Sequence, residues 1–150
     1  MTDKLKEKEE FRYAPIGVFD SGVGGLTVAR EIMRQIPKER IIYFGDTARV
    51  PYGSKSKETI IRFSRQIIRF LQSKGVKAIV IACNTASALA LETVQPEFDI
   101  PILGVVKAGA KEAAKVTKNG KIGVIATEST IESQLYTKEI HSHKPNAQVL

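Results

Sequence analysis

Short continuous apolar runs alternate along the chain with segments in which apolar residues recur every three or four positions. The short runs predict strands buried on both faces, and the periodic segments predict amphipathic helices. The predicted strands are residues 16–19, 41–44, 78–82, 100–106, 121–126 and 147–150. The predicted helices are residues 26–35, 58–74, 86–94, 110–116 and 131–141. This alternation, with loops of a few residues, predicts the α/β class, built from right-handed βαβ units around a mostly parallel sheet.

Small polar residues gather where the predicted strands end. Asp20-Ser21-Gly22 follows the first strand, a loop around Tyr52-Gly53 follows the second, and Cys83-Asn84-Thr85 follows the third. A polar turn, Thr127 to Thr130, follows the fifth strand and can join them from a neighbouring unit. Because the carboxyl ends of parallel strands lie along one edge of a sheet, we expect these loops to converge on a ligand site.

The only cysteine, Cys83, stands where a buried strand ends and a helix begins. A thiol in that position has its thiolate favoured by free backbone N–H groups and by the helix dipole. A free cysteine is more commonly just a small buried hydrophobic residue. The position of Cys83 alone leaves both interpretations open.

The converging loops offer one carboxylate, one thiol, an amide, several hydroxyls and free backbone N–H groups. This set suits a small polar ligand that carries both a carboxylate and an ammonium. Hydroxyl and N–H groups would bind the carboxylate, and Asp20 would bind the ammonium. The thiol of Cys83 would then take or give a proton at the carbon between them.

Composition narrows the class of protein. The chain has 150 residues, one domain's worth, with 43% hydrophobic and 26% charged residues, as in ordinary globular proteins. No apolar run is long enough to span a bilayer, and the N-terminus lacks the apolar core of a secretory signal. With a single cysteine, which suits the cytoplasm, we expect a cytoplasmic protein with no membrane partner. The net charge of +7 comes without a basic cluster interleaved with aromatics, so we expect no nucleic-acid partner.

The spacing of residues argues against several familiar kinds of nucleotide, metal and protease site. The glycine-rich loop 20–25 matches neither the dinucleotide fingerprint nor the P-loop, although its N–H groups could hold a phosphate. Cys83 has no cysteine or histidine at metal-ligand spacing, and His141 and His143 have no third ligand nearby, so we predict no metal. A Cys-His protease site would need a histidine brought against Cys83. Asp46 stays open between a turn or cap residue and a functional one.

Four blocks of the sequence carry a family resemblance. They are residues 17–28 (GVFDSGVGGLTV), 43–53 (YFGDTARVPYG), 82–88 (ACNTASA) and 123–130 (GVIATEST). In this order and spacing they resemble the signature blocks of the glutamate racemases, within the aspartate/glutamate racemase superfamily. The resemblance implies an isomerase that interconverts L- and D-glutamate without a cofactor and supplies D-glutamate for peptidoglycan. It also implies two similar α/β domains with glutamate between them, and two cysteines that act from opposite faces of the α-carbon.

The resemblance carries over to individual positions of this chain. It implies that Cys83 is one acid/base thiol and that Asp20 helps to tune the protonation of the site. The substrate-binding positions that it implies are Asp20, Ser21, Tyr52, Gly53, Asn84, Thr85 and, more weakly, Thr127 and Thr130.

This chain also departs from the family pattern. The second cysteine of the family lies in a later Cys-Thr-His block that this sequence lacks, and Lys107-Ala108 stands where an acidic residue and proline are expected. We therefore expect an N-terminal portion only: a charged tail at 1–13, an incomplete first racemase domain at 14–106, and the truncated start of a second at 107–150. Such a chain would be inactive alone and marginally folded.

Two alternatives stay open. The parent could be a racemase of another amino acid, such as aspartate. The chain could instead be a non-catalytic glutamate-binding fragment, which the missing second cysteine favours. A nucleic-acid-binding protein comes third, on charge alone. A homodimer would be one way to supply a second acid/base.

Overall fold

The computed structural model describes residues 11–150, and its larger part is built on a parallel four-stranded sheet. The strands are β1 (Ile16–Asp20), β2 (Ile41–Gly45), β3 (Ala78–Ile81) and β4 (Ile102–Gly104), in the order β2-β1-β3-β4. In register, Ile16 lies beside Ile41 on one side and Ala78 on the other. The α/β class and the parallel βαβ organisation predicted from the sequence are confirmed. We call residues 16–104 the four-stranded unit.

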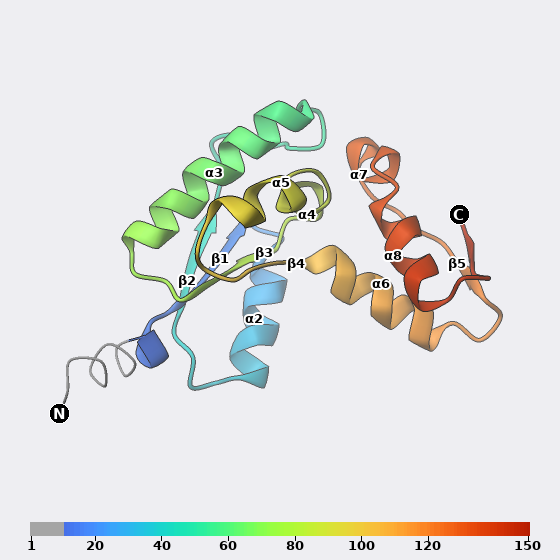
Figure 1. Cartoon of the computed structure of the whole chain (residues 1–150), viewed down its shortest axis with the longest axis horizontal. Helices are drawn as coiled ribbons and strands as arrows, with labels where there is room; N and C mark the ends of the chain where they lie inside the picture. The colour runs from blue at the N-terminus through green and yellow to red at the C-terminus, as the bar shows by residue number, and fades with distance from the viewer. Residues whose placement is uncertain (1–10) are drawn as a thin grey trace.

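Helices cover both faces of this sheet (Figure 1). One face is covered by α2 (Leu26–Gln35), and the other by α3 (Lys57–Ser73), α4 (Asn84–Leu89), α5 (Leu91–Val94) and the 3-10 turn η1 (Gln95–Glu97). Successive strand residues face opposite ways: Val18 packs in the cluster of Ala29 in α2, whereas Phe19 packs in the cluster of Ile60 in α3. Burial on both faces explains why β1 and β3 are continuous apolar runs.

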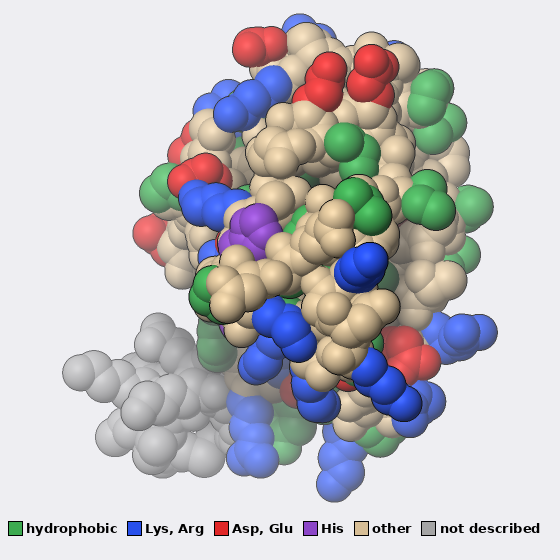
Figure 2. All heavy atoms as spheres, turned by 90° about the vertical axis from the view of Figure 1, so that its right-hand side faces the viewer, with side chains coloured by type: hydrophobic (Ala, Val, Ile, Leu, Met, Phe, Trp, Pro, Cys, Tyr) green, Lys and Arg blue, Asp and Glu red, His purple; other side chains and the backbone are tan. Residues whose placement is uncertain are grey.

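The rest of the chain forms a smaller layer, residues 105–149, which we call the two-stranded unit. Its elements are α6 (Val105–Val116), β5 (Lys121–Ile122), α7 (Glu128–Glu132), α8 (Leu135–His143) and β6 (Gln148–Val149). The strands β5 and β6 pair in parallel, and Ala110, Ile140 and Ala147 form a small buried core. Figure 2 views the molecule from this side, with hydrophobic side chains open across the upper part and Lys and Arg gathered below.

Three predicted elements between residues 86 and 116 differ in extent from those observed. The strand predicted at 100–106 is only β4, because the chain leaves the sheet at Val105 and begins α6 there. The N–H of Val105 donates to Ser87 Oγ at 3.2 Å rather than to a strand. The helix predicted at 110–116 therefore begins at Val105, and the helix predicted at 86–94 is divided into α4 and α5 at Ala90.

Three predictions for the last part of the chain are wrong. The strand predicted at 121–126 ends at Ile122, because only Lys121 and Ile122 find partners in β6 and no other described strand pairs with β5. The polar turn predicted at 127–130 lies mostly inside α7. The helix predicted at 131–141 is interrupted at Gln134, whose left-handed backbone, with φ of 54°, separates α7 from α8.

The predicted charged tail lies mostly outside the described residues. Of residues 1–13, only 11–13 are described, and they are helical.

Candidate active site

The loops at the carboxyl edge of the four-stranded sheet surround a cavity of about 640 Å³. Five of the predicted site residues line it: Asp20, Ser21, Cys83, Asn84 and Thr85. Predicted Thr127 and Thr130 line a second cavity of about 420 Å³ instead, which Asn84 and Thr85 share as a common wall. Tyr52 and Gly53 line neither of these two cavities. The expected convergence of polar loops is therefore present, but it is divided over two adjoining spaces.

Cys83 lies between β3 and α4, as the sequence predicts, with an extended backbone that caps the helix. Its sulfur accepts the N–H of Ala86 at 3.5 Å and donates to Ser21 Oγ at the same distance of 3.5 Å. The side chain is only 5% exposed, yet it lines the larger cavity. Cys83 is thus a buried small residue whose sulfur still borders the cavity, and its role as an acid/base thiol stays a prediction.

Asp20 ends β1 and is wrapped by the glycine-rich loop that follows it. Its Oδ2 accepts the N–H groups of Gly22 at 3.1 Å and Gly25 at 3.0 Å. A Cβ at position 25 would lie 2.5 Å from the Asp20 Cβ, so only glycine lets the loop close around this carboxylate. Among the described residues, nothing hydrogen-bonds to Oδ1 of Asp20, which leaves that oxygen available to a cation in the cavity.

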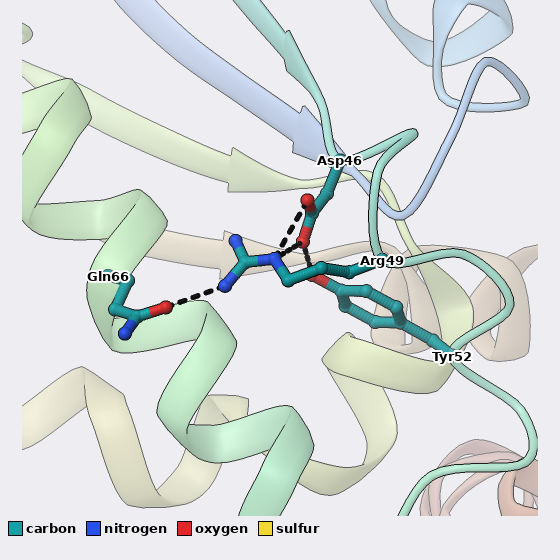
Figure 3. A network of polar contacts seen from close by, with 4 residues as sticks. All are labelled: Asp46, Arg49, Tyr52 and Gln66. Atoms are coloured by element: carbon teal, nitrogen blue, oxygen red, sulfur yellow. Dashed lines mark hydrogen bonds and ion pairs between the residues drawn. The ribbon is translucent and has the colours of Figure 1, made fainter.

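Tyr52 is held in a buried polar network rather than at the cavity (Figure 3). Its phenol, 2% exposed, donates to the buried carboxylate of Asp46. Burial, followed by this hydrogen bond, raises the pKa of Tyr52 far above its ordinary value. Arg49 neutralises Asp46 at 2.7 Å and donates to Gln66 at 2.6 Å, while its guanidinium stacks 4.2 Å above the Phe63 ring. Asp46 is thus an anchor of the 46–53 loop, a role that the sequence left open.

Three threonine hydroxyls join the two units. Thr127 Oγ1 lies 3.0 Å from Thr85 Oγ1 and 2.9 Å from Thr130 Oγ1, and Thr130 reaches Thr85 at 3.4 Å. Ser129 adds a bond to the carbonyl oxygen of Gly53 at 3.3 Å. A Cβ at Gly53 would meet Thr127 at 2.8 Å, so glycine is what lets α7 approach the loop. Through these contacts, predicted residues from distant blocks do lie side by side.

Tyr136, which the sequence patterns did not single out, also connects the two units. From α8 its hydroxyl donates to Asn84 Oδ1 at 2.7 Å, and it lines both cavities. Burial raises the pKa of the Tyr136 phenol. Nothing local in the polar stretch around it could have revealed this contact, because the two residues are 52 positions apart.

The described residues form neither a metal site of three ligands nor a membrane-spanning helix. Within 11–150, no group of three or more His, Cys, Asp or Glu side chains is placed to hold a metal ion. His141 Nε2 instead lies 2.9 Å from the carbonyl oxygen of Ala147. No helix in the described part of the chain combines the length and apolar character needed to cross a bilayer.

Comparison with known proteins shows which family this chain resembles in sequence and fold. The family described as Asp/Glu/Hydantoin racemase matches residues 16–149. A glutamate racemase of Geobacter metallireducens is 55% identical over 135 residues, which cover 90% of this chain and 50% of that relative. The crystal structure of a glutamate racemase isoform from Bacillus anthracis superposes with a TM-score of 0.88 at 50% identity, covering 91% of this chain and 52% of the other.

A third similar protein carries a ligand. The glutamate racemase of Francisella tularensis, solved in complex with D-glutamate, matches with a TM-score of 0.82 and 48% identity over 91% of this chain and 51% of that one. The chain thus spans about half the length of the relatives it matches. With the family match extending over nearly all described strands and helices, the chain belongs to the Asp/Glu/Hydantoin racemase family.

Proposed function

We propose that this chain is the N-terminal half of a glutamate racemase and supplies one of its two acid/base thiols. The observation that carries the proposal is the sulfur of Cys83 at the wall of a cavity that Asp20, Ser21, Asn84 and Thr85 also line. The relatives named glutamate racemase, one of them holding D-glutamate, support glutamate as the substrate.

The chemistry follows from the groups around the cavity. The Cys83 thiolate takes the α-proton of one enantiomer, and the electron pair of the broken C–H bond stays on the substrate as a carbanion next to its carboxylate. N–H and hydroxyl groups of Asn84 and Thr85 stabilise that carboxylate as charge spreads onto it. Asp20 Oδ1 binds the ammonium. A second thiol, from sequence beyond these 150 residues, returns a proton to the opposite face.

The proposal extends to the parts of the site that lie outside the main cavity. Thr127 and Thr130 bind substrate through the hydroxyl cluster with Thr85, whereas Tyr52 and Gly53 act through the backbone of the anchored loop. Residues 14–106 and 107–150 would be the first domain and the start of the second.

The broader assignment belongs to the same proposal. The parent enzyme works in the cytoplasm without a cofactor and provides D-glutamate for peptidoglycan synthesis, and hence for cell-wall biogenesis and cell shape. Its partner is the small-molecule substrate rather than nucleic acid. A homodimer is the assembly to test first.

The alternative is that the chain binds glutamate without catalysis, because it has one cysteine and a two-thiol inversion needs two. A racemase for another amino acid, such as aspartate, differs only in which ligand fits the same cavity.

The test is to incubate the purified chain with L- or D-glutamate in heavy water, following the α-proton by NMR and the optical rotation. Because one thiol faces one side of the α-carbon, we expect deuterium to enter one enantiomer only, without racemisation. Cys83→Ala should bind glutamate and exchange nothing.

Each other outcome has a defined meaning. Binding without exchange in the unmodified chain would favour the non-catalytic alternative, and equal exchange of aspartate would favour the other racemase. Full racemisation that depends on Cys83 would show that a second copy supplies the other acid/base. Failure to bind either glutamate enantiomer would overturn the proposal for this chain.

A further inference from the structure

One of the hydrogen bonds between the two units involves the side-chain amide of a candidate site residue, Asn84. Asn84, the first residue of α4, belongs to the four-stranded unit, whereas Tyr136 lies in α8 of the two-stranded unit (Figure 1). The Tyr136 hydroxyl donates to Asn84 Oδ1 at 2.7 Å. Both side chains line the cavity that contains Cys83, and both also line the neighbouring cavity beneath β5. The contact therefore stands in the wall between the two spaces.

The chemistry of the two groups determines which way the Asn84 side-chain amide faces. An asparagine side chain has an acceptor oxygen on one side and an NH₂ donor on the other, and it can turn over by rotation about its last bond. A phenol that donates to the oxygen fixes which way the amide faces. Because Oδ1 is turned toward Tyr136, the NH₂ group is the side left for a ligand. A tyrosine phenol already keeps its proton at neutral pH, and burial raises the pKa of Tyr136 further, so it stays a donor.

We propose that Tyr136 is a positioning residue for Asn84: its hydroxyl holds the amide so that the NH₂ group donates to the carboxylate of the substrate bound beside Cys83. Tyr136 itself touches no reacting atom. The ligand part of this inference rests on the proposed function, whereas the fixed orientation of Asn84 does not. The arrangement also makes binding in the four-stranded unit depend on correct docking of α8.

The positioning role of Tyr136 is tested by removing only its hydroxyl. Tyr136→Phe keeps the ring and its packing against α6, where a Cβ at Gly109 would lie 3.5 Å from the ring. We expect the variant to bind D-glutamate about five- to tenfold more weakly, the loss that follows when one hydrogen bond to a ligand-binding amide is removed. Tyr13→Phe, which changes an exposed phenol, is the matched control and should bind D-glutamate unchanged.

A double-mutant cycle separates positioning from a general structural effect. D-Glutamate affinity is measured by NMR titration for the unmodified chain, Tyr136→Phe, Asn84→Ala and the double variant. If the phenol acts through Asn84, Tyr136→Phe has no further effect once Asn84 is alanine. An equal loss in both backgrounds, or no loss in Tyr136→Phe alone, overturns the proposal.

A second measurement needs no ligand. Nitrogen-15 relaxation of the Asn84 side-chain amide should show an ordered NH₂ group in the unmodified chain and a more mobile one in Tyr136→Phe, with Asn119 and Asn146 as internal references. If the unmodified chain binds no D-glutamate, the proposed function fails, and this comparison still decides the role of Tyr136. Unchanged order at Asn84 overturns it.

Discussion

The four-stranded and two-stranded units repeat the same alternation of strand and helix. They differ in how fully their apolar strand residues are buried. In the first, Val18 and Phe19 of β1 point to opposite faces of the sheet, and both are fully buried. Beside the second, apolar residues that follow the paired strands stay exposed: Ile125 after β5 is fully exposed, and Leu150 after β6 is 74% exposed. A strand becomes a core strand only when neighbours lie on both sides of it, whatever its own apolar content.

The joint between the units shows a second difference. Each unit has an apolar core of its own, whereas polar side chains recur at the contact between them: the cluster of Thr85, Thr127 and Thr130, and the bond from Tyr136 to Asn84. Polar contacts of this kind depend on geometry more than on buried area, and each contributes only about 0.5–1.5 kcal/mol. The site thus lies beside a joint at which polar contacts recur.

The largest effect should come from the same truncation made in each unit. Ile81 in β3 and Ile140 in α8 are both fully buried. Ile→Ala in a core costs about 2–5 kcal/mol, and we expect Ile81→Ala near the upper end, because β3 lies inside the sheet between two other strands. Ile140→Ala should fall near the lower end, since the small core around it can collapse. Urea unfolding followed by circular dichroism measures both.

Hydrogen exchange sharpens this comparison. Ile140→Ala should remove protection from amides of residues 105–149 while leaving those of β1 and β3 protected. If Ile140→Ala instead removes protection from the amides of both units equally, the chain unfolds as one cooperative body, and the two units do not differ in local stability.

A smaller effect is expected at the joint itself. Gly53→Ala places a Cβ 2.8 Å from Thr127, so α7 must move away or the loop must shift. Overpacking of this kind costs about 1–3 kcal/mol. We expect the loss of protection to appear at α7 first, together with weaker D-glutamate binding. Gly75→Ala is a poor control because its backbone has φ of 71°, whereas Gly123→Ala has nothing near its Cβ and should leave the protection of α7 unchanged.

Sequence patterns predicted the four-stranded unit well for a physical reason. Strands buried on both faces and helices with one buried face leave local signals, so β1, β3, α2 and α3 could be found from periodicity. Cys83 could be placed at the end of β3 for the same reason. The apolar run 121–126 carried the same signal but extends past the two residues that β6 pairs, so its prediction as a strand was wrong.

The residues that the patterns missed act over long distances. Asp46 stays open between a turn or cap residue and a functional one until Tyr52 and Arg49 are seen on its carboxylate. Nothing in the sequence near Tyr136 predicts its contact with Asn84. The break at Gln134 is also invisible, because the left-handed residue there is neither glycine nor asparagine. Contacts between units, unlike burial within one, follow from the folded arrangement and not from spacing.

Alkaline pH should destabilise the folded chain, whereas its stability near neutral pH should stay unchanged. Burial raises the pKa values of Tyr43, Tyr52 and Tyr136 in the folded chain, and Tyr52 is raised further by its bond to Asp46. The unfolded state therefore releases these protons first, above about pH 10, so stability is full below that pH and falls as the pH rises through the folded values. Urea midpoints at pH 9 and pH 11 measure the loss.

Replacing the phenol tests this assignment. Tyr52→Phe should flatten the decline between the two pH values, since its own proton no longer contributes. A decline that is just as steep in Tyr52→Phe would assign the alkaline loss to other groups.

The smallest effect is expected from the ion pair of Arg65 in α3 with Glu97 in η1. The pair is bidentate, at 2.6 and 2.7 Å, but both side chains are about one-third exposed to water. Exposed pairs of this kind contribute little to stability, so Glu97→Ala should shift the urea midpoint only slightly. The shift should vanish in 1 M salt, which screens exposed charges but leaves the Ile81→Ala loss intact. A large, salt-independent loss would mean that the charged surface contributes to the stability of the four-stranded unit as its buried sheet does.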